Sequence, residues 1–285
     1  MTISSRSAPP TVQILGSTRL ARVAMSWLVD QGRARVVGLD PGEEDESRPW
    51  FAPVRGLARD YGIPLGRSPA EVTLDLDPDA RPSRGEGVMV RVLAPARATS
   101  ADVNRVFLVG GDWQLTVCNA EGTAAWVEVP LPWEGATDAT EVLERATLTG
   151  IEALADVFPA LLEGAEPTPL TAPLKPGRWR PQENFLLWER SAEAIAARVR
   201  ASSGPWGGGR TNCGSTTLWF EDACALTSDR VGDLPGTVVA IDTGLTVAAA
   251  SGLVRVERLR PGWRPVRRAG DWAREVGLSP GYQLG

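Results

Sequence analysis

Residues 11–39 read TVQILGSTRLARVAMSWLVDQGRARVVGL, and this stretch decides the fold. The first five residues form an apolar run of the β type, and the next three suit a turn. Apolar side chains then recur from Leu20 to Leu28 at i, i+3, i+4, i+7 and i+8, which predicts an amphipathic helix ending near Gly32. The last run, residues 35–39, is a second β segment. This β–α–β order predicts a parallel sheet with a right-handed crossover.

The first turn is a candidate ligand-binding position. It contains one glycine, Gly16, and therefore lacks the GxGxxG pattern that holds a dinucleotide. The N–H groups at the start of a helix nevertheless attract anions. We expect Ser17, Thr18 and Arg19 to be ligand-binding candidates at this turn.

Further elements follow from apolar periodicity and from the glycines and prolines that interrupt it. Helices are predicted over residues 50–61 and 137–162 and after Ser191, which suits an N-cap. Strands are predicted over residues 63–65, 88–93, 106–109, 113–118, 125–129, 216–220, 236–241, 245–249 and 253–259. Residues 66–86 are predicted to be irregular because they are rich in Pro, Asp and Arg.

The chain is predicted to contain two domains. Five prolines between residues 165 and 184 indicate an extended linker. An α/β domain with a parallel sheet is expected over 1–164. Short strands with tight turns over 185–285 suit a small β-barrel of the OB-like kind.

The 285 residues include no histidine, which limits the chemistry open to the chain. Histidine is the only side chain whose unperturbed pKa lies near neutrality. Ser-His and Cys-His nucleophile pairs are excluded, and so are zinc sites that contain histidine. The three cysteines form no CxxC motif, so no metal site or disulfide framework is expected. Reduced thiols, no apolar signal core and no long apolar run predict a cytoplasmic protein without a membrane segment.

Charge is distributed unevenly along the chain. Residues 1–174 hold 15 Arg and 24 acidic residues, a net charge of −9, whereas residues 175–285 hold 15 basic and 11 acidic residues, a net charge of +4. The stretch from Arg255 to Arg268 contains six arginines and one acidic residue, Glu257. This stretch is either a solvated basic face or a docking surface for an acidic partner such as tRNA or a carrier protein.

Several short motifs resemble one known family. They are QILGS at 13–17, YGIP at 61–64, WERSAEAI at 188–195, PGTV at 235–238, DTGLTV at 242–247, GDW at 270–272 and PGYQLG at 280–285. Together they resemble the methionyl-tRNA formyltransferase family, whose relatives also formylate sugars and carrier-bound amino acids. The resemblance implies a Rossmann-like formyltransferase domain followed by an OB-like barrel. It also implies reduced folate as a possible cofactor, although no cofactor is expected from the residues themselves.

The catalytic segment of that family has no counterpart here. The family carries Asn-x-His in a loop after its central strand and an Asp further on. In this chain, residues 88–95 are followed within about twenty residues by the strand at 113–118, so the loop is interpreted as shortened. The candidates that remain for catalysis are Asn104, Cys118, Asn119 and Glu121. The structural alternative for Cys118 is a small, buried apolar residue at a strand end, and the alternative for Glu121 is a solvated turn residue.

Three functional hypotheses stay open. The first is a pseudoenzyme: a formyltransferase scaffold kept for binding or regulation. The second is a repurposed transferase in small-molecule biosynthesis, acting on an amine-bearing or carrier-bound substrate. The third is a docking module that binds tRNA or a carrier protein through its basic C-terminal domain. A small-molecule ligand is compatible with each of them.

Overall fold

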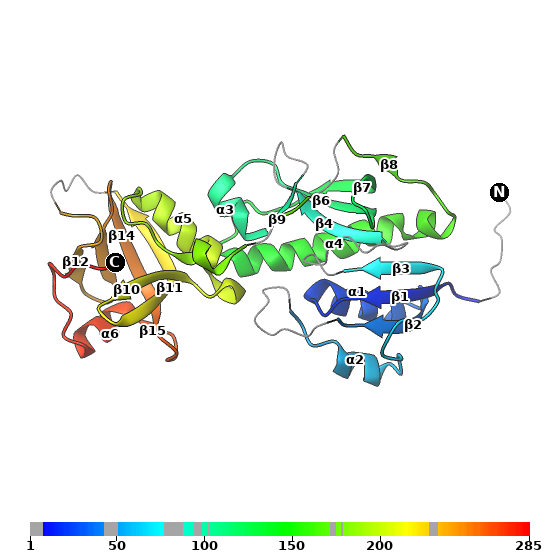
Figure 1. The fold of residues 1–285 in the computed structure, drawn as a ribbon, viewed down its shortest axis with the longest axis horizontal. Helices are drawn as coiled ribbons and strands as arrows, with labels where there is room; N and C mark the ends of the chain where they lie inside the picture. The colour runs from blue at the N-terminus through cyan, green and yellow to red at the C-terminus, as the bar shows by residue number, and fades with distance from the viewer. Residues whose placement is uncertain are drawn as a thin grey trace. The chain divides into compact units, whose positions relative to one another are not determined.

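The computed structural model describes residues 8–42, 51–76, 88–93, 99–101, 103–171, 175–177, 179–227 and 233–285 (Figure 1). The chain divides into two compact units. The first comprises Met1–Asp102, Gly111–Trp133 and Leu143–Arg178, and the second comprises Val103–Gly110, Glu134–Val142 and Trp179–Gly285. The segment interpreted as a linker contains β8 (Thr168–Pro169), β9 (Lys175–Gly177) and the 3-10 helix η2 (Pro181–Asn184). The domain bounds given above stay predictions.

The first unit contains the predicted β–α–β arrangement, which is confirmed. Strand β1 (Thr11–Leu15) pairs in parallel with β2 (Arg35–Asp40), and α1 (Arg19–Asp30) connects them. On its other side β1 pairs in parallel with β3 (Val72–Asp75), which pairs in parallel with β4 (Val88–Leu93). Strand β3 lies within the segment predicted to be irregular, and that prediction is wrong for these four residues. Their apolar members are buried, since they continue the sheet beside β1.

The sheet continues with antiparallel strands. Strand β6 (Gln114–Asn119) pairs antiparallel with β4 and with β7 (Ala124–Pro130), and β8 pairs with β7. The order is β2-β1-β3-β4-β6-β7-β8, while β5 (Thr99–Ala101) pairs with β4 and β9. The sheet is therefore mixed, with its parallel part at β2-β1-β3-β4. The segment interpreted as a shortened loop is described at 99–101 and from 103 onward, and residues 94–98 and 102 lie outside the described residues.

Several helices differ from the predicted ones. Helix α2 (Arg55–Asp60) is shorter than predicted, and the expected strand at 63–65 is reduced to one bridge. Residues 106–109, predicted as a strand, form a single helical turn, α3 (Val106–Val109). Four apolar residues in a row suit either structure, and packing against α5 favours the helix. Helix α4 (Ala139–Leu162) agrees with its prediction.

The second unit is built around an antiparallel sheet. Helix α5 (Ala192–Ser202) begins at the predicted cap, because the Ser191 hydroxyl accepts from the Ala194 N–H at 3.3 Å. It ends at the 3-10 helix η3 (Gly204–Trp206). The strands follow the order β10-β11-β14-β13-β12, and β15 pairs with β14. Their bounds are β10 Gly209–Cys213, β11 Thr216–Leu226, β12 Val238–Ile241, β13 Leu245–Ala248, β14 Leu253–Pro261 and β15 Arg267–Arg268.

Four of these strands were predicted, whereas β10, β15 and α6 (Ala269–Glu275) were not. The core of the unit includes Ile195, Phe220, Val256 and Trp272, all at most 3% exposed. The closed OB-like barrel stays a prediction. In neither unit do the described residues include a helix that is both long and apolar enough to cross a membrane.

Candidate functional site

The turn after β1 lies at the carboxyl edge of the parallel strands, where ligands bind in many open α/β sheets. Thr18 is 1% exposed, and its hydroxyl accepts from the Ala21 N–H at 3.1 Å and donates to the Leu76 carbonyl at 2.7 Å. This hydroxyl therefore caps α1 and ties it to the residue after β3. Ser17 is buried beside it at 3% exposure.

Arg19 begins α1 and makes a long ion pair with Glu144, with 3.5 Å between guanidinium nitrogen and carboxylate oxygen. Its side chain is 38% exposed, so such a pair adds little to stability. The guanidinium stays accessible at the edge where Ser17 lies. The ligand-binding roles of Ser17, Thr18 and Arg19 stay predictions.

Asp75 is a candidate that the sequence analysis missed. It ends β3 opposite Leu15 and is 2% exposed, so its carboxyl group is buried at the same edge as Ser17. The signal for this strand was the run VTLD at 72–75, in which the apolar residues Val72 and Leu74 alternate with Thr73 and Asp75. The prolines further on instead favoured an irregular segment. A buried carboxyl in such a place is an ordinary candidate for acid–base chemistry.

Cys118 and Asn119 lie at the end of β6. Cys118 packs within the sheet, and Asn119 stabilises the β6–β7 hairpin. Cys118 is fully buried in a small cluster with Ala125. The Asn119 Oδ1 accepts from the N–H groups of Thr123 at 2.9 Å and Ala124 at 3.1 Å, while its Nδ2 donates to the Thr123 hydroxyl at 2.9 Å. This amide holds the β6–β7 turn. Glu121 projects from the same turn and is exposed.

Strand register separates these residues from the turn after β1. Leu15, Asp75, Met89 and Cys118 are successive partners across β1, β3, β4 and β6. Three strand spacings of about 4.8 Å put roughly 14 Å between the first and the last backbone. Because β6 runs antiparallel to β4, the turn that follows Cys118 lies toward the amino ends of the parallel strands, away from Ser17.

Asn104 belongs to the second unit rather than to this edge. It lies in the 3-10 helix η1 (Val103–Arg105), is fully buried, and donates from Nδ2 to the Ala201 carbonyl at 2.9 Å. Its side chain therefore fastens η1 to α5. Cys118, Asn119 and Glu121 belong to the first unit, and the catalytic roles of all four residues stay predictions.

The second unit has a candidate ligand pocket beside α5. A hollow of about 550 Å³ is lined by apolar side chains from α3 and the segment before α5, with two arginines among them: Phe107, Leu108, Phe185, Leu187, Arg190 and Arg198. Its volume is within the range of small-molecule sites. Next to it, Arg105 and Arg198 lie 5.3 and 5.6 Å from the Trp179 ring centroid. Burial lowers the pKa of Arg198, and the charge of Glu183 opposes that effect.

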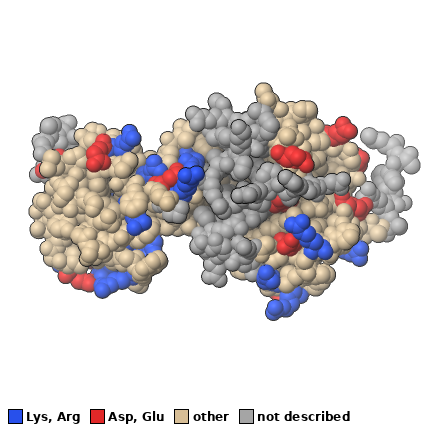
Figure 2. Space-filling view, viewed as in Figure 1, with Lys and Arg blue, Asp and Glu red and all other residues tan. Residues whose placement is uncertain are grey.

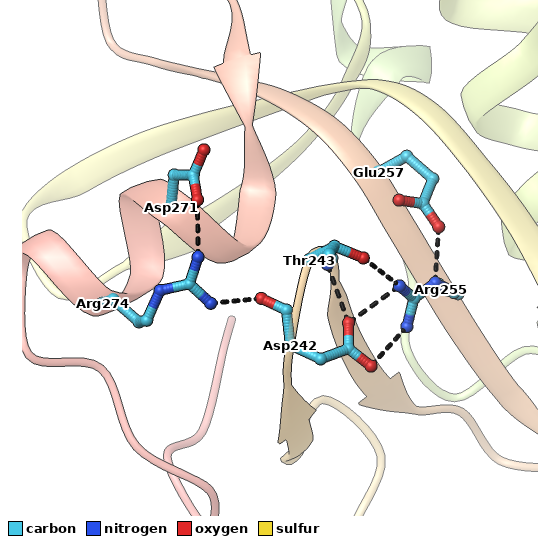
Figure 3. Close-up of polar contacts among 7 residues, drawn as sticks. Asp242, Thr243, Arg255, Glu257, Asp271 and Arg274 are labelled. Carbon is cyan, nitrogen blue, oxygen red and sulfur yellow. Dashed lines mark hydrogen bonds and ion pairs between the residues drawn. The ribbon is translucent and has the colours of Figure 1, made fainter.

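A polar network holds the hairpin between β12 and β13 (Figure 3). The Arg255 guanidinium donates to both Asp242 carboxylate oxygens at 2.8 and 3.0 Å and to Glu257 at 2.5 Å. The hydrogen bond from Arg255 holds the pKa of Asp242 well below its ordinary value. Arg274 of α6 bonds the Asp242 carbonyl and the Asp271 carboxylate, so the network ties α6 to the hairpin.

Ion pairs partly neutralise the basic stretch between Arg255 and Arg268. Arg255 is neutralised by two carboxylates, Arg260 lies 3.4 Å from Glu221, and Arg267 lies 2.5 Å from Glu275. Basic and acidic side chains also lie close together on the face shown in Figure 2. Among the described residues no group of three side chains is arranged to hold a metal ion.

Comparisons with known proteins agree with this architecture. Residues 178–276 match the family described as Formyl transferase, C-terminal domain. A methionyl-tRNA formyltransferase of Roseiflexus castenholzii is 26% identical over 312 residues, which cover 96% of this chain and 98% of the relative.

Solved structures share the fold at low sequence identity. HypX from Aquifex aeolicus in complex with tetrahydrofolic acid has a TM-score of 0.62 and 13% identity, and the match covers 93% of this chain and 46% of that one. WlaRD, a sugar 3N-formyl transferase, has a TM-score of 0.64 and 9% identity, covering 87% and 97%. The chain thus shares its fold with a solved sugar formyl transferase. Over its whole length the chain is similar to a methionyl-tRNA formyltransferase, and residues 178–276 match the C-terminal formyltransferase family, in agreement with the resemblance of its motifs.

Proposed function

We propose that this protein is a non-catalytic member of its family, a scaffold for binding or regulation that does not perform ordinary folate-dependent formyl transfer. One observation carries the proposal: the chain has no histidine. A positioned acid–base group contributes typically 10²–10⁴-fold to a rate, and oxyanion stabilisation a further 10²–10³-fold. A scaffold without these groups retains shape but little catalytic power.

The bonding of the remaining candidates supports this proposal. All polar atoms of the Asn119 side chain are used in the β6–β7 turn, and Asn104 is tied to α5. Cys118 is fully buried, which disfavours the thiolate that a nucleophile needs. Each residue therefore has a structural task that competes with a catalytic one.

Binding partners are part of the same proposal. The relatives act on tRNA or bind folate, so tRNA, a carrier protein or a small molecule is a reasonable ligand for this chain. The C-terminal unit is the more basic part and also contains the hollow beside α5. Three free thiols fit a reducing compartment, and we include a cytoplasmic location in the proposal.

Folate titration and turnover test the proposal together. We expect calorimetry with 5-formyltetrahydrofolate to give no binding. We also expect 10-formyltetrahydrofolate with methionyl-tRNA or an amino-sugar nucleotide to give no formyl product above the uncatalysed rate. An active methionyl-tRNA formyltransferase serves as the positive control. Tight folate binding accompanied by turnover would reject the proposal.

A second candidate function rests on Asp75. A carboxyl group that is 2% exposed at the carboxyl edge of the sheet favours a repurposed transferase with its own general base. If such an activity exists, Asp75→Asn should abolish it while Asp60→Asn, at an exposed acid of the same unit, leaves it unchanged. Thermal unfolding of both variants separates a lost base from a lost fold. Equal activity in wild type and Asp75→Asn would remove this candidate.

A further inference from the structure

A tryptophan is presented almost fully to solvent by the turn between β14 and β15. Trp263 is 96% exposed, although the turn that carries it is held in place. The Arg264 N–H donates to the Pro261 carbonyl at 3.1 Å, and the Gly262 N–H donates to the Thr217 carbonyl at 2.8 Å. Such an indole is an apolar group held outside the core, and tryptophans of this kind are common anchors of protein interfaces.

Two arginines lie side by side in β14 and β15, the strands that this turn connects. Arg258 and Arg268 are direct partners across the β14–β15 ladder, an arrangement that is destabilising for like charges. Within the part of the chain that the structure describes, neither makes an ion pair with a carboxylate. Both line a hollow of about 570 Å³ together with Glu257. We call Trp263, Arg258 and Arg268 the hairpin surface.

Helix α4 carries a surface of opposite charge. Glu144, Leu148 and Glu152 follow one another at a spacing of four residues, so they share one face of the helix. Glu144 and Leu148 are each 61% exposed, and Glu152 is also exposed. An exposed leucine thus lies between two carboxylates, each about 6 Å away along the helix axis. We call these three residues the α4 surface.

We propose that the hairpin surface of one copy of this protein docks on the α4 surface of a second copy. Trp263 would cover Leu148, and Arg258 and Arg268 would lie against Glu144 and Glu152. The overall charges favour the same pairing, since residues 1–174 carry −9 and residues 175–285 carry +4. Pairing in a twofold dimer would form the contact twice and leave neither surface uncovered.

A nucleic acid fits the hairpin surface less well. Glu257 lines the same hollow, and Glu275 lies 2.5 Å from Arg267 beside it. A phosphate backbone that followed the arginines would meet both carboxylates and an acidic protein overall. The α4 surface offers separate carboxylates that can meet individual arginines, and Glu144 would exchange its long 3.5 Å pair with Arg19 for one of them.

Sedimentation equilibrium of the full chain tests the proposal. Wild type should dimerise, and the affinity should fall as salt rises from 50 to 500 mM because the charged pairs are exposed. Trp263→Ser should weaken the dimer at least about tenfold, as loss of an aromatic anchor does. The matched control is Leu234→Ser, which removes another exposed apolar side chain, 72% exposed and outside both surfaces.

A charge exchange identifies the two surfaces as partners. The variant R258E/R268E should weaken the dimer, and so should E144R/E152R. Combining all four substitutions should restore the affinity. Circular dichroism confirms that each variant is folded. A monomeric wild type, a dimer that Trp263→Ser leaves unchanged, or failure of the combined variant to recover would overturn the proposal. So would a monomer that binds tRNA through Trp263 and Arg258.

Discussion

Substituting Gly270 by alanine should destabilise the C-terminal unit. Gly270 lies in the first turn of α6, and its N–H donates to the Thr243 carbonyl at 3.3 Å. A Cβ added to it would lie 2.1 Å from the Asp242 carbonyl oxygen and 2.7 Å from the Thr243 carbonyl carbon. Both of these atoms are backbone, so they cannot rotate away. Helix α6 would have to move away from the hairpin that carries Asp242.

The size of the effect follows from what α6 buries. Relieving the overlap requires a displacement of about 1 Å, since carbon and oxygen atoms in contact lie roughly 3.2 Å or more apart. Trp272, 3% exposed, would lose part of its packing, and Arg274 would be drawn from the Asp242 carbonyl. Overpacking of this kind typically costs 1–3 kcal/mol. The better helix propensity of alanine returns at most about 1 kcal/mol, so we expect a net loss of about 1–2 kcal/mol.

Urea unfolding followed by circular dichroism measures this loss. Gly285→Ala is the matched control, because a Cβ at Gly285 would meet no atom within 4 Å. The control should agree with wild type within about 0.5 kcal/mol. If Gly270→Ala were equally close to wild type, the contact between α6 and the hairpin would not be as tight as described, and the reasoning would be refuted.

Three further predictions concern single side chains. The hydrogen bond from Arg255 lowers the folded-state pKa of Asp242 below its ordinary 3.8, so this carboxylate stabilises the fold above about pH 4 and the contribution is lost as pH falls. Thermal melts between pH 2 and 7 should therefore lose part of their acid sensitivity in Asp242→Asn; an unchanged pH profile would contradict this. Phe220→Ala should reduce the free energy of unfolding by about 3–5 kcal/mol, because Phe220 is fully buried, and a loss below about 1 kcal/mol in urea titration would contradict it. Asn119→Ala should cost about 1–2 kcal/mol in the same titration, since three hydrogen bonds of the β6–β7 turn disappear, whereas Glu121→Ala should be neutral; equal stability of the two variants would contradict this.

Local sequence signals predicted much of the fold. The β1–α1–β2 unit and the cap of α5 at Ser191 depend on residues close together in the chain, and both are confirmed. The strand predicted at 106–109 was wrong. Four apolar residues are compatible with a strand or a helical turn, and only packing against α5 distinguishes the two. Strand β3 was missed, since the prolines after it obscured a four-residue run.

The candidate site was harder to predict than the fold. The sequence suggested Cys118 and Asn119 as catalytic candidates, but whether the turn after them lies at the carboxyl edge of the sheet depends on strand direction, which no local pattern reveals. Antiparallel pairing of β6 with β4 directs the turn after Asn119 the other way. Asp242, a partner of Arg255, comes from the turn between β12 and β13, so a stretch that looks basic in the sequence is partly neutralised in the fold.

The central claim is that this chain, which has no histidine, does not catalyse ordinary folate-dependent formyl transfer. The most direct measurement is single-turnover formyl transfer, with the protein in excess over labelled 10-formyltetrahydrofolate and with methionyl-tRNA as acceptor. We predict a rate equal to that of the same mixture without protein. Formyl-methionyl-tRNA appearing faster with this protein than without it, in proportion to its concentration, would contradict the account.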